Sequence, residues 1–181
     1  MKKAILILFI LPTMLLAQTK DTFVITGTLK GMLDNTELVL KNEEITPEPL
    51  ATVKSNGQQF TMTGKIAEPG MYYIQPKNSQ QKLIIFLDAS TITVEGEFVK
   101  LQSASVKGSP SHNDFALFSA TFNPLFSKLT AIAQQLNQGV KDENGMIRKQ
   151  YETIVQDINK KTDQFLAEHF SSPVAPFVLL V

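Results

Sequence analysis

The chain contains no cysteine and no tryptophan, and its 181 residues include only two histidines, His112 and His169. Without cysteine, thiolate catalysis, Cys-x-x-Cys redox chemistry and cysteine-ligated zinc are all excluded. Two histidines are too few for a His-rich metal site. We therefore expect no catalytic residue, no cofactor and no metal in this chain, and we do not expect it to be an enzyme.

An excess of charge of either sign is also missing. The chain has 17 basic and 17 acidic residues. Removal of residues 1–17, which contain Lys2 and Lys3, leaves 15 basic and 17 acidic residues, a formal net charge of −2. Nucleic-acid binding needs a concentrated positive face. The composition therefore argues against nucleic acid as a partner.

Residues 1–17 have the order of a secretory signal peptide, with Lys2 and Lys3 before an uncharged apolar run that ends at Ala17. This run is shorter than the ~20 residues that a helix needs to cross a bilayer. A small residue at its end suits cleavage between Ala17 and Gln18. We predict a periplasmic or secreted protein of the cell envelope, with no stable membrane anchor after cleavage. A buried N-terminal strand or a retained anchor is the alternative.

Residues 18–108 are predicted to form a β-rich domain, because short β-type runs alternate there with turn residues. The runs cover residues 23–29, 37–40, 51–54, 59–63, 71–74, 82–87, 91–96 and 104–107. Such spacing favours an antiparallel sandwich or a partly open barrel. The run at 82–87 is almost wholly apolar, which indicates a strand covered on both faces. Asn56-Gly57 predicts a tight hairpin turn.

Residues 109–172 are predicted to form a helical hairpin that acts as a connector. Apolar residues recur there at steps of three and four, first at Phe115, Phe118, Phe122, Leu125, Leu129, Ile132 and Leu136. Ser111 and Asp114 suit the capped start of this first helix, and Pro124 predicts a kink or two abutting helices. A second apolar stripe predicts a helix over 146–169. The fold class is thus α+β, with a sandwich or barrel followed by an antiparallel helical hairpin.

Residues 173–181 form an apolar run after the second helix, with Pro176 placed where a new helix could start. Apolar chain ends are seldom left exposed. We expect this run to be the start of a truncated element, with a natural end of the chain as the alternative.

Four groups of residues are candidates for a functional site. Ser109, Ser111, His112 and Asp114 lie together, but one helix start is where capping residues gather, and a serine triad draws on separate elements. Asp88, Glu95 and Glu97 lack calcium-loop spacing and suit solvated strand ends. The phenylalanines of the first helix suit a core better than a ligand groove. Tyr72 and Tyr73 lie on opposite faces of one strand, so we expect at least one exposed ring and a candidate binding surface.

Several segments carry a resemblance to a known family. They are FVITGTLKG (23–31), GKIAEPGMY (64–72), IIFLD (84–88), VKGS (106–109) and NDF (113–115). With the signal peptide before them, they resemble the domain of unknown function at the N-terminus of exported TlpA/ResA-like thiol-disulfide oxidoreductases. The resemblance implies a β-rich domain and helical connector before a thioredoxin-like domain with a Trp-Cys-x-x-Cys motif. Because this chain has neither tryptophan nor cysteine, no catalytic residue carries over.

The resemblance implies a non-catalytic accessory domain, or a truncated form of one, that positions a redox domain or a client protein in the periplasm. Its partners would be a thioredoxin-like redox domain or an envelope client protein. The alternative is a stand-alone envelope binding module for a protein, peptide or glycan. The sequence contains no set of residues that would converge to form the active site of an enzyme that works without cysteine or metal.

Overall fold

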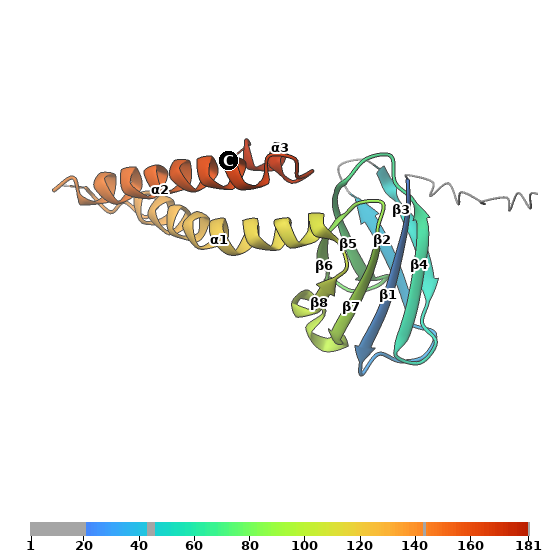
Figure 1. Ribbon diagram of the computed structural model, residues 1–181. Helices are drawn as coiled ribbons and strands as arrows, with labels where there is room; N and C mark the ends of the chain where they lie inside the picture. Colours follow the sequence, from blue (N-terminus) through green and yellow to red (C-terminus); the bar gives the residue numbers. More distant parts are fainter. Residues whose placement is uncertain (1–20, 43–45, 143, 181) are drawn as a thin grey trace, which may run out of the picture.

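The computed structural model describes residues 21–42, 46–142 and 144–180. The predicted signal peptide and its cleavage position between Ala17 and Gln18 lie outside the described residues, so both stay predictions. Figure 1 shows a β-sandwich followed by a pair of long helices that projects away from it. The predicted α+β fold, a sandwich followed by a helical hairpin, is confirmed.

Two four-stranded sheets form the sandwich, in the orders β4-β1-β7-β8 and β3-β2-β5-β6. The strands are β1 Thr22–Lys30, β2 Glu37–Asn42, β3 Thr46–Lys54, β4 Gln59–Lys65, β5 Gly70–Pro76, β6 Leu83–Leu87, β7 Thr91–Glu97 and β8 Ser105–Lys107. Each strand overlaps a predicted run, although β3 begins well before residue 51. A short 3-10 helix, η1 Phe98–Ser103, separates β7 from β8 and was not predicted.

The pairing of the strands differs from the prediction at two places. β1 and β7 run parallel, in register from Val24 opposite Thr91, while the other paired strands are antiparallel. A parallel pair needs a crossover, and here the chain leaves this sheet twice, through β2 and β3 and then, after β4, through β5 and β6, before it returns as β7. Asn56-Gly57 does form a turn, with Gly57 at a φ of 57°. However, β3 and β4 on its two sides belong to different sheets, so the turn connects the sheets and closes no hairpin ladder.

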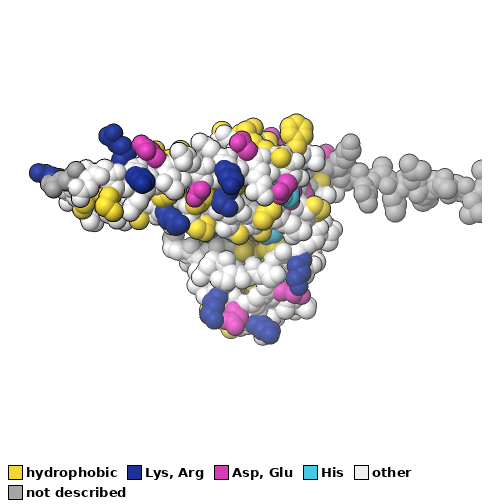
Figure 2. Space-filling view, turned by 60° about the vertical axis from the view of Figure 1, so that its left-hand side comes forward, with side chains coloured by type: hydrophobic (Ala, Val, Ile, Leu, Met, Phe, Trp, Pro, Cys, Tyr) yellow, Lys and Arg dark blue, Asp and Glu magenta, His cyan; other side chains and the backbone are white. Residues whose placement is uncertain are grey.

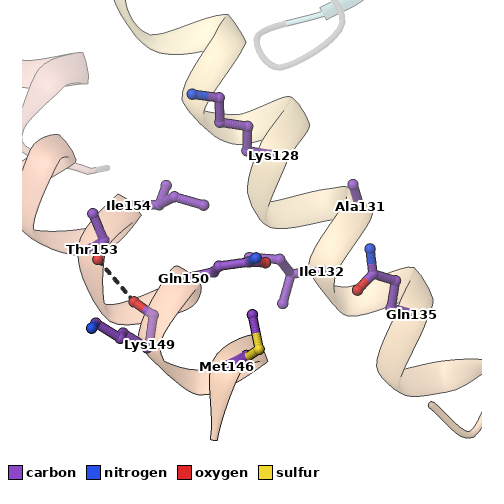
Figure 3. Close-up of a pocket in the computed structure, with 9 residues that line it drawn as sticks. All are labelled: Lys128, Ala131, Ile132, Gln135, Met146, Lys149, Gln150, Thr153 and Ile154. Carbon is purple, nitrogen blue, oxygen red and sulfur yellow. Dashed lines mark hydrogen bonds between the residues drawn. The ribbon is translucent and has the colours of Figure 1, made fainter. Parts of the chain in front are cut away.

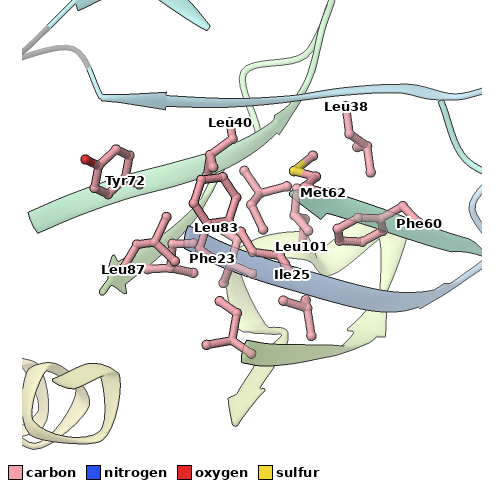
Figure 4. Packing of buried hydrophobic residues seen from close by; sticks show 14 of the residues in the cluster. Phe23, Ile25, Leu38, Leu40, Phe60, Met62, Tyr72, Leu83, Leu87 and Leu101 are labelled. Atoms are coloured by element: carbon pink, nitrogen blue, oxygen red, sulfur yellow. The ribbon is translucent and has the colours of Figure 1, made fainter. Parts of the chain in front are cut away.

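Alternating apolar residues of both sheets meet in the centre of the sandwich (Figure 4). In β1, Phe23, Ile25 and Leu29 point inward and are fully buried. Gly27 leaves a gap in this row, and the ring of Phe60 from β4 fills it. A Cβ at Gly27 would collide with Cε1 of that ring, so any larger residue there would require the buried ring of Phe60 to move. The resemblance segment at 23–31 therefore contains a packing requirement of the fold.

Two long helices, α1 Pro110–Asn137 and α2 Met146–His169, form an antiparallel pair with the short helix α3 Ala175–Val178 beside α2. We call these three helices the helical arm. α1 runs through Pro124 as one helix, so of the two outcomes predicted there, a kink or two abutting helices, the second is wrong. α2 has the predicted bounds. The carboxylate of Asp142 accepts the N–H groups of Ile147 and Arg148, both at 2.9 Å, which serves as a cap for α2.

The predicted cap of α1 is wrong in its residue. Ser109 is the N-cap, and its Oγ accepts the backbone N–H of His112 at 3.0 Å. Pro110 follows at the first helical position, where no N–H is needed and the fixed φ of proline suits a helix. Ser111, the predicted cap, lies inside the first turn and is buried. Proline at position 110 therefore fixes the start of the helix two residues earlier than expected.

A second apolar cluster holds the arm together and is separate from the sandwich core. Its buried members are Phe86, Phe122, Leu125, Ile132, Ile154, Ile158, Phe165, Val174 and Val178. The apolar stripe of α1 thus faces α2, as the sequence predicts for a core. Val174 and Val178 bring the segment around α3 into the same cluster, while Leu179 and Leu180 are exposed. The interpretation of residues 173–181 as a truncated element stays a prediction.

Candidate functional site

The joint between the sandwich and the arm is centred on Phe86 of β6. Its neighbours Ile85 and Leu87 point into the sandwich core, but Phe86 points the other way and belongs to the cluster of the arm. Its ring lies 5.9 Å from that of Phe115 in α1 and 5.4 Å from that of Phe177 in α3, the latter edge to face. The prediction that the run at 82–87 is covered on both faces holds at Phe86 but is wrong at Ile84 on the same face, which is 48% exposed. Phe86 is therefore a side chain of the sandwich that completes the core of the arm.

Polar contacts fix the same joint at the start of α1. The backbone N–H of Phe86 donates to Nδ1 of His112 at 3.2 Å, so a ring from the arm satisfies a donor of β6. Ser109 Oγ donates to Asp88 Oδ1 at 3.2 Å, and Ser90 Oγ donates to the same carboxylate. Ser109 and His112 are buried. These bonds fix the direction in which α1 leaves the sheet, because they hold the first turn from two sides.

Gly108 makes the close approach at this joint possible. It has a φ of +100°, and a Cβ there would lie 2.5 Å from the carbonyl oxygen of Thr91 in β7. A side chain at this position would therefore be strained and would also collide with backbone. The segment VKGS at 106–109 is thus required for the passage from β8 into α1.

The serine, histidine and aspartate at the joint do not form a catalytic triad. Nδ1 of His112 is engaged by a backbone N–H, and Ser109 Oγ contacts Asp88 and the backbone of His112. Ser109 is also fully buried, so no substrate can reach its hydroxyl. Asp114 lies farther along α1 and pairs with His169 of α2, at 2.9 Å between Oδ1 and Nδ1. The sequence prediction that this cluster caps a helix is confirmed, with Ser109 in place of Ser111 as the cap.

Burial sets the charge state of His112. Loss of hydration lowers the pKa of its imidazole, and the nearby carboxylate of Asp88 opposes this shift more weakly. The neutral ring fits the geometry, because Nδ1 must be unprotonated to accept the N–H of Phe86. Protonation of His112 would therefore remove one of the bonds that hold the joint.

The candidate binding surface at Tyr72 and Tyr73 is wrong. Tyr72 is only 4% exposed and Tyr73 only 7%. Tyr72 belongs to the sandwich core, and burial raises the pKa of its phenol. Tyr73 points to the outer side of the sheet, where the ammonium of Lys82 lies 4.8 Å from the centre of its ring. Strand alternation predicted opposite faces correctly, but it could not predict that both faces of β5 are covered at this point.

The three acidic residues singled out in the sequence do not come together. Asp88 binds Ser90 and Ser109, Glu95 pairs with Lys107 at 3.4 Å, and Glu97 pairs with Lys100 at 3.2 Å. Among the residues that the structure describes, no group of three or more His, Asp or Glu side chains is placed to hold a metal ion. The same described ranges contain no helix that is long and apolar enough to cross a membrane.

The outer end of the arm carries an open apolar groove between α1 and α2, which we call the tip groove (Figure 3). Its volume is about 520 Å³. Ala131 and the exposed Met146 provide apolar surface, the largely buried Ile132 and Ile154 form the floor, and Lys128 and Lys149 line the groove from opposite helices. Figure 2 shows that charged side chains of both signs are spread along the face of the arm in view, with apolar side chains exposed between them.

Sequence reasoning missed both the joint and the tip groove. The joint had one readable signal, the almost wholly apolar run at 82–87, which indicates a strand with a second covering layer. No sequence signal pointed to the tip groove, because Ile132 and Ile154 are ordinary members of the apolar stripes of the two helices. It exists because the two helices leave apolar surface uncovered between Met146 and Ala131 at the outer end. The phenylalanines of α1, by contrast, form core, as predicted.

Comparison with known proteins gives one family. The family described as "Domain of unknown function (DUF4369)" matches residues 23–115, which is 93 of the 181 residues and includes the whole sandwich from Phe23 on and the first turn of α1. No curated protein matches the chain. The matched region contains Gly27 and Gly108, where a Cβ would collide with neighbouring atoms, and every residue of the joint from Phe86 to His112. The chain belongs to the DUF4369 family.

Proposed function

We propose that the chain is a non-catalytic accessory domain of an exported TlpA/ResA-like thiol-disulfide oxidoreductase. In this role it positions a thioredoxin-like redox domain or a client protein in the periplasm. The observation that carries the proposal is the joint, because Phe86, His112 and Ser109 give the arm a fixed direction relative to the sandwich. A domain that positions another must keep its own parts in a fixed arrangement.

The sequence supports the proposal in two ways. The segments that resemble this class of oxidoreductase, 23–31, 64–72, 84–88 and 106–115, lie in the sandwich and the joint, within the family match. The chain has no cysteine, so it cannot itself exchange thiols and disulfides. A role beside a redox domain is consistent with both facts.

The first test is the reading frame beyond Val181. A Cys-x-x-Cys motif in a thioredoxin-like sequence there supports the proposal, whereas a stop codon together with a monomeric, well-folded 18–181 protein counts against it. The second test is an insulin reduction assay on the 18–181 protein with dithiothreitol as the electron source. We expect no turnover above the rate of dithiothreitol alone, and turnover would show that the chain is not an accessory domain.

A third test separates positioning from chemistry in the full-length protein. Phe86→Ala should slow the reduction of a protein client and leave the reduction of a small disulfide, such as oxidised glutathione, unchanged. The small disulfide needs only the redox motif, whereas the client needs the arm in its fixed direction. Equal rates with the client before and after the substitution would contradict a positioning role.

The alternative is a stand-alone envelope module that binds a protein, peptide or glycan. The tip groove favours it, because a groove of about 520 Å³ with apolar surface is large enough for several side chains of a ligand. None of the described residues that line this groove is aromatic, so they offer no flat ring of the kind that commonly stacks on sugars. A protein or peptide is therefore the better ligand class for this alternative.

A further inference from the structure

The tip groove combines an apolar surface with the positive charge of two lysines. Ile132 and Ile154 lie between the helices, and the exposed Met146 extends the apolar surface at the end of α2 (Figure 3). Lys128 comes from α1 and Lys149 from α2, and none of the described residues that line the groove carries a carboxylate. Within the described residues, neither ammonium group forms an ion pair. A ligand for this groove therefore needs apolar side chains and negative charge.

The charge decides against a second copy of this chain as the occupant. In a two-fold dimer formed through the groove, the same patch faces itself. Lys128 and Lys149 would then lie opposite the same lysines, and none of the described residues of the groove is acidic and could compensate them. Like charges that face each other across an interface oppose association. A different molecule with carboxylates is the better occupant.

The shape of the groove indicates what that molecule is. The lining residues of α1 run from Lys128 to Gln135, which is about 10 Å along a helix axis. This length fits apolar side chains spaced at i, i+3 or i+4, and i+7 on one face of a helix, the usual way in which a helix binds a groove. We propose that the tip groove binds an amphipathic helix of a partner protein, whose apolar face fills the groove and whose acidic residues pair with Lys128 and Lys149.

This inference goes beyond the proposed function and does not rest on it, because an accessory domain and a stand-alone module could both bind a partner in this way. The surface is small compared with that of a stable complex, so we expect a dissociation constant on the order of 10–100 µM. The contacts with the lysines are exposed, so they contribute mainly to selectivity for acidic partners and to the salt dependence of binding.

The test uses two synthetic 18-residue helical peptides with leucines at i, i+3, i+4 and i+7. One carries glutamates beside the leucines, and the other carries lysines at the same positions. Binding to the 18–181 protein is measured by NMR with labelled isoleucine and methionine methyl groups. We expect the acidic peptide to shift the signals of Ile132, Met146 and Ile154, and the basic peptide to leave them unchanged.

The matched variant is Lys128→Glu combined with Lys149→Glu, and circular dichroism checks its fold because both side chains are exposed. We expect about tenfold weaker binding of the acidic peptide and a gain of binding for the basic one. Three results would overturn the inference: no binding of the acidic peptide at 1 mM, equal binding of both peptides to the unsubstituted protein, or shifts located away from the groove. Dimerisation that shifts the Met146 signal as protein concentration rises would also overturn it, in favour of a second copy.

Discussion

Replacement of Phe86 by alanine tests whether one side chain of the sandwich holds the arm in place. The side chain is fully buried, and its ring contacts those of Phe115 at 5.9 Å and Phe177 at 5.4 Å. Truncation of a core phenylalanine to alanine costs about 3–5 kcal/mol. The two ring contacts, worth about 0.5–1.5 kcal/mol each, are part of that loss. Because a domain of this kind is stable by about 5–15 kcal/mol, Phe86→Ala should remove a large share of the stability of the joint.

Urea unfolding followed by circular dichroism measures the loss, and hydrogen exchange measures where it falls. We expect faster exchange in the first turns of α1 and in α3, with little change in β1 and β7. Ile85→Ala is the matched control, because Ile85 is the next residue of β6 and is also fully buried, but it faces the sandwich core. It should cost about 2–5 kcal/mol and speed exchange in the sandwich instead. A loss below about 1 kcal/mol for Phe86→Ala, or one exchange pattern for both variants, would refute the role of Phe86.

Three further predictions concern the joint. Ser109→Ala should lower the free energy of unfolding by about 1 kcal/mol, as expected for a lost N-cap, and Ser111→Ala should lower it less. Urea unfolding that shows a larger loss for Ser111→Ala would contradict the assigned cap. Gly108→Ala should lower the free energy of unfolding by about 1–3 kcal/mol more than Gly139→Ala, because both glycines have a positive φ but only a Cβ at 108 meets backbone. Equal losses of stability in thermal unfolding would argue against this clash. The pKa of His112 in the folded chain is below its usual value of 6.5. Below about pH 6.5 the unfolded chain therefore binds more protons than the folded chain. The free energy of unfolding should decrease as the pH falls from about 6.5 to the pKa of the folded chain. His112→Asn keeps an acceptor for the N–H of Phe86 and does not titrate. Between pH 7 and pH 4.5 the urea midpoint of this variant should therefore depend less on pH than that of the unsubstituted protein. The same pH dependence in both proteins would exclude His112 as its source.

Local patterns in the sequence were enough to predict the strands and the two long helices. The β-type run at 23–29 and the steps of three and four in α1 each depend on residues close together in the chain, and both appear in the structure as predicted. The start of α1 was misplaced because two serines near Pro110 could each cap it. Pro110 at the first helical position selects Ser109, and Asp88, which lies 21 residues earlier, accepts a hydrogen bond from the same hydroxyl.

Features that depend on distant segments could not be predicted. The parallel pairing of β1 with β7 and the separation of β3 from β4 into different sheets are properties of the topology, which no local pattern encodes. Both tyrosines of β5 are buried for the same reason, since the covering of the outer face depends on other parts of the chain. The tip groove depends on how closely α1 and α2 approach each other at their outer ends. The apolar stripes of the two helices predict that the helices pack together, but not their separation at those ends.

The most direct test of the account is a measurement of how rigidly the arm is held. Because the chain has no cysteine, Thr61→Cys on β4 and Gln134→Cys on α1 introduce two unique and exposed positions for spin labels. Double electron–electron resonance then gives the distribution of distances between the sandwich and the arm. We predict one narrow distribution that becomes broad when Phe86→Ala is added. A broad distribution in the labelled protein with Phe86 intact, or one that Phe86→Ala leaves unchanged, would contradict the claim that the joint fixes the direction of the arm.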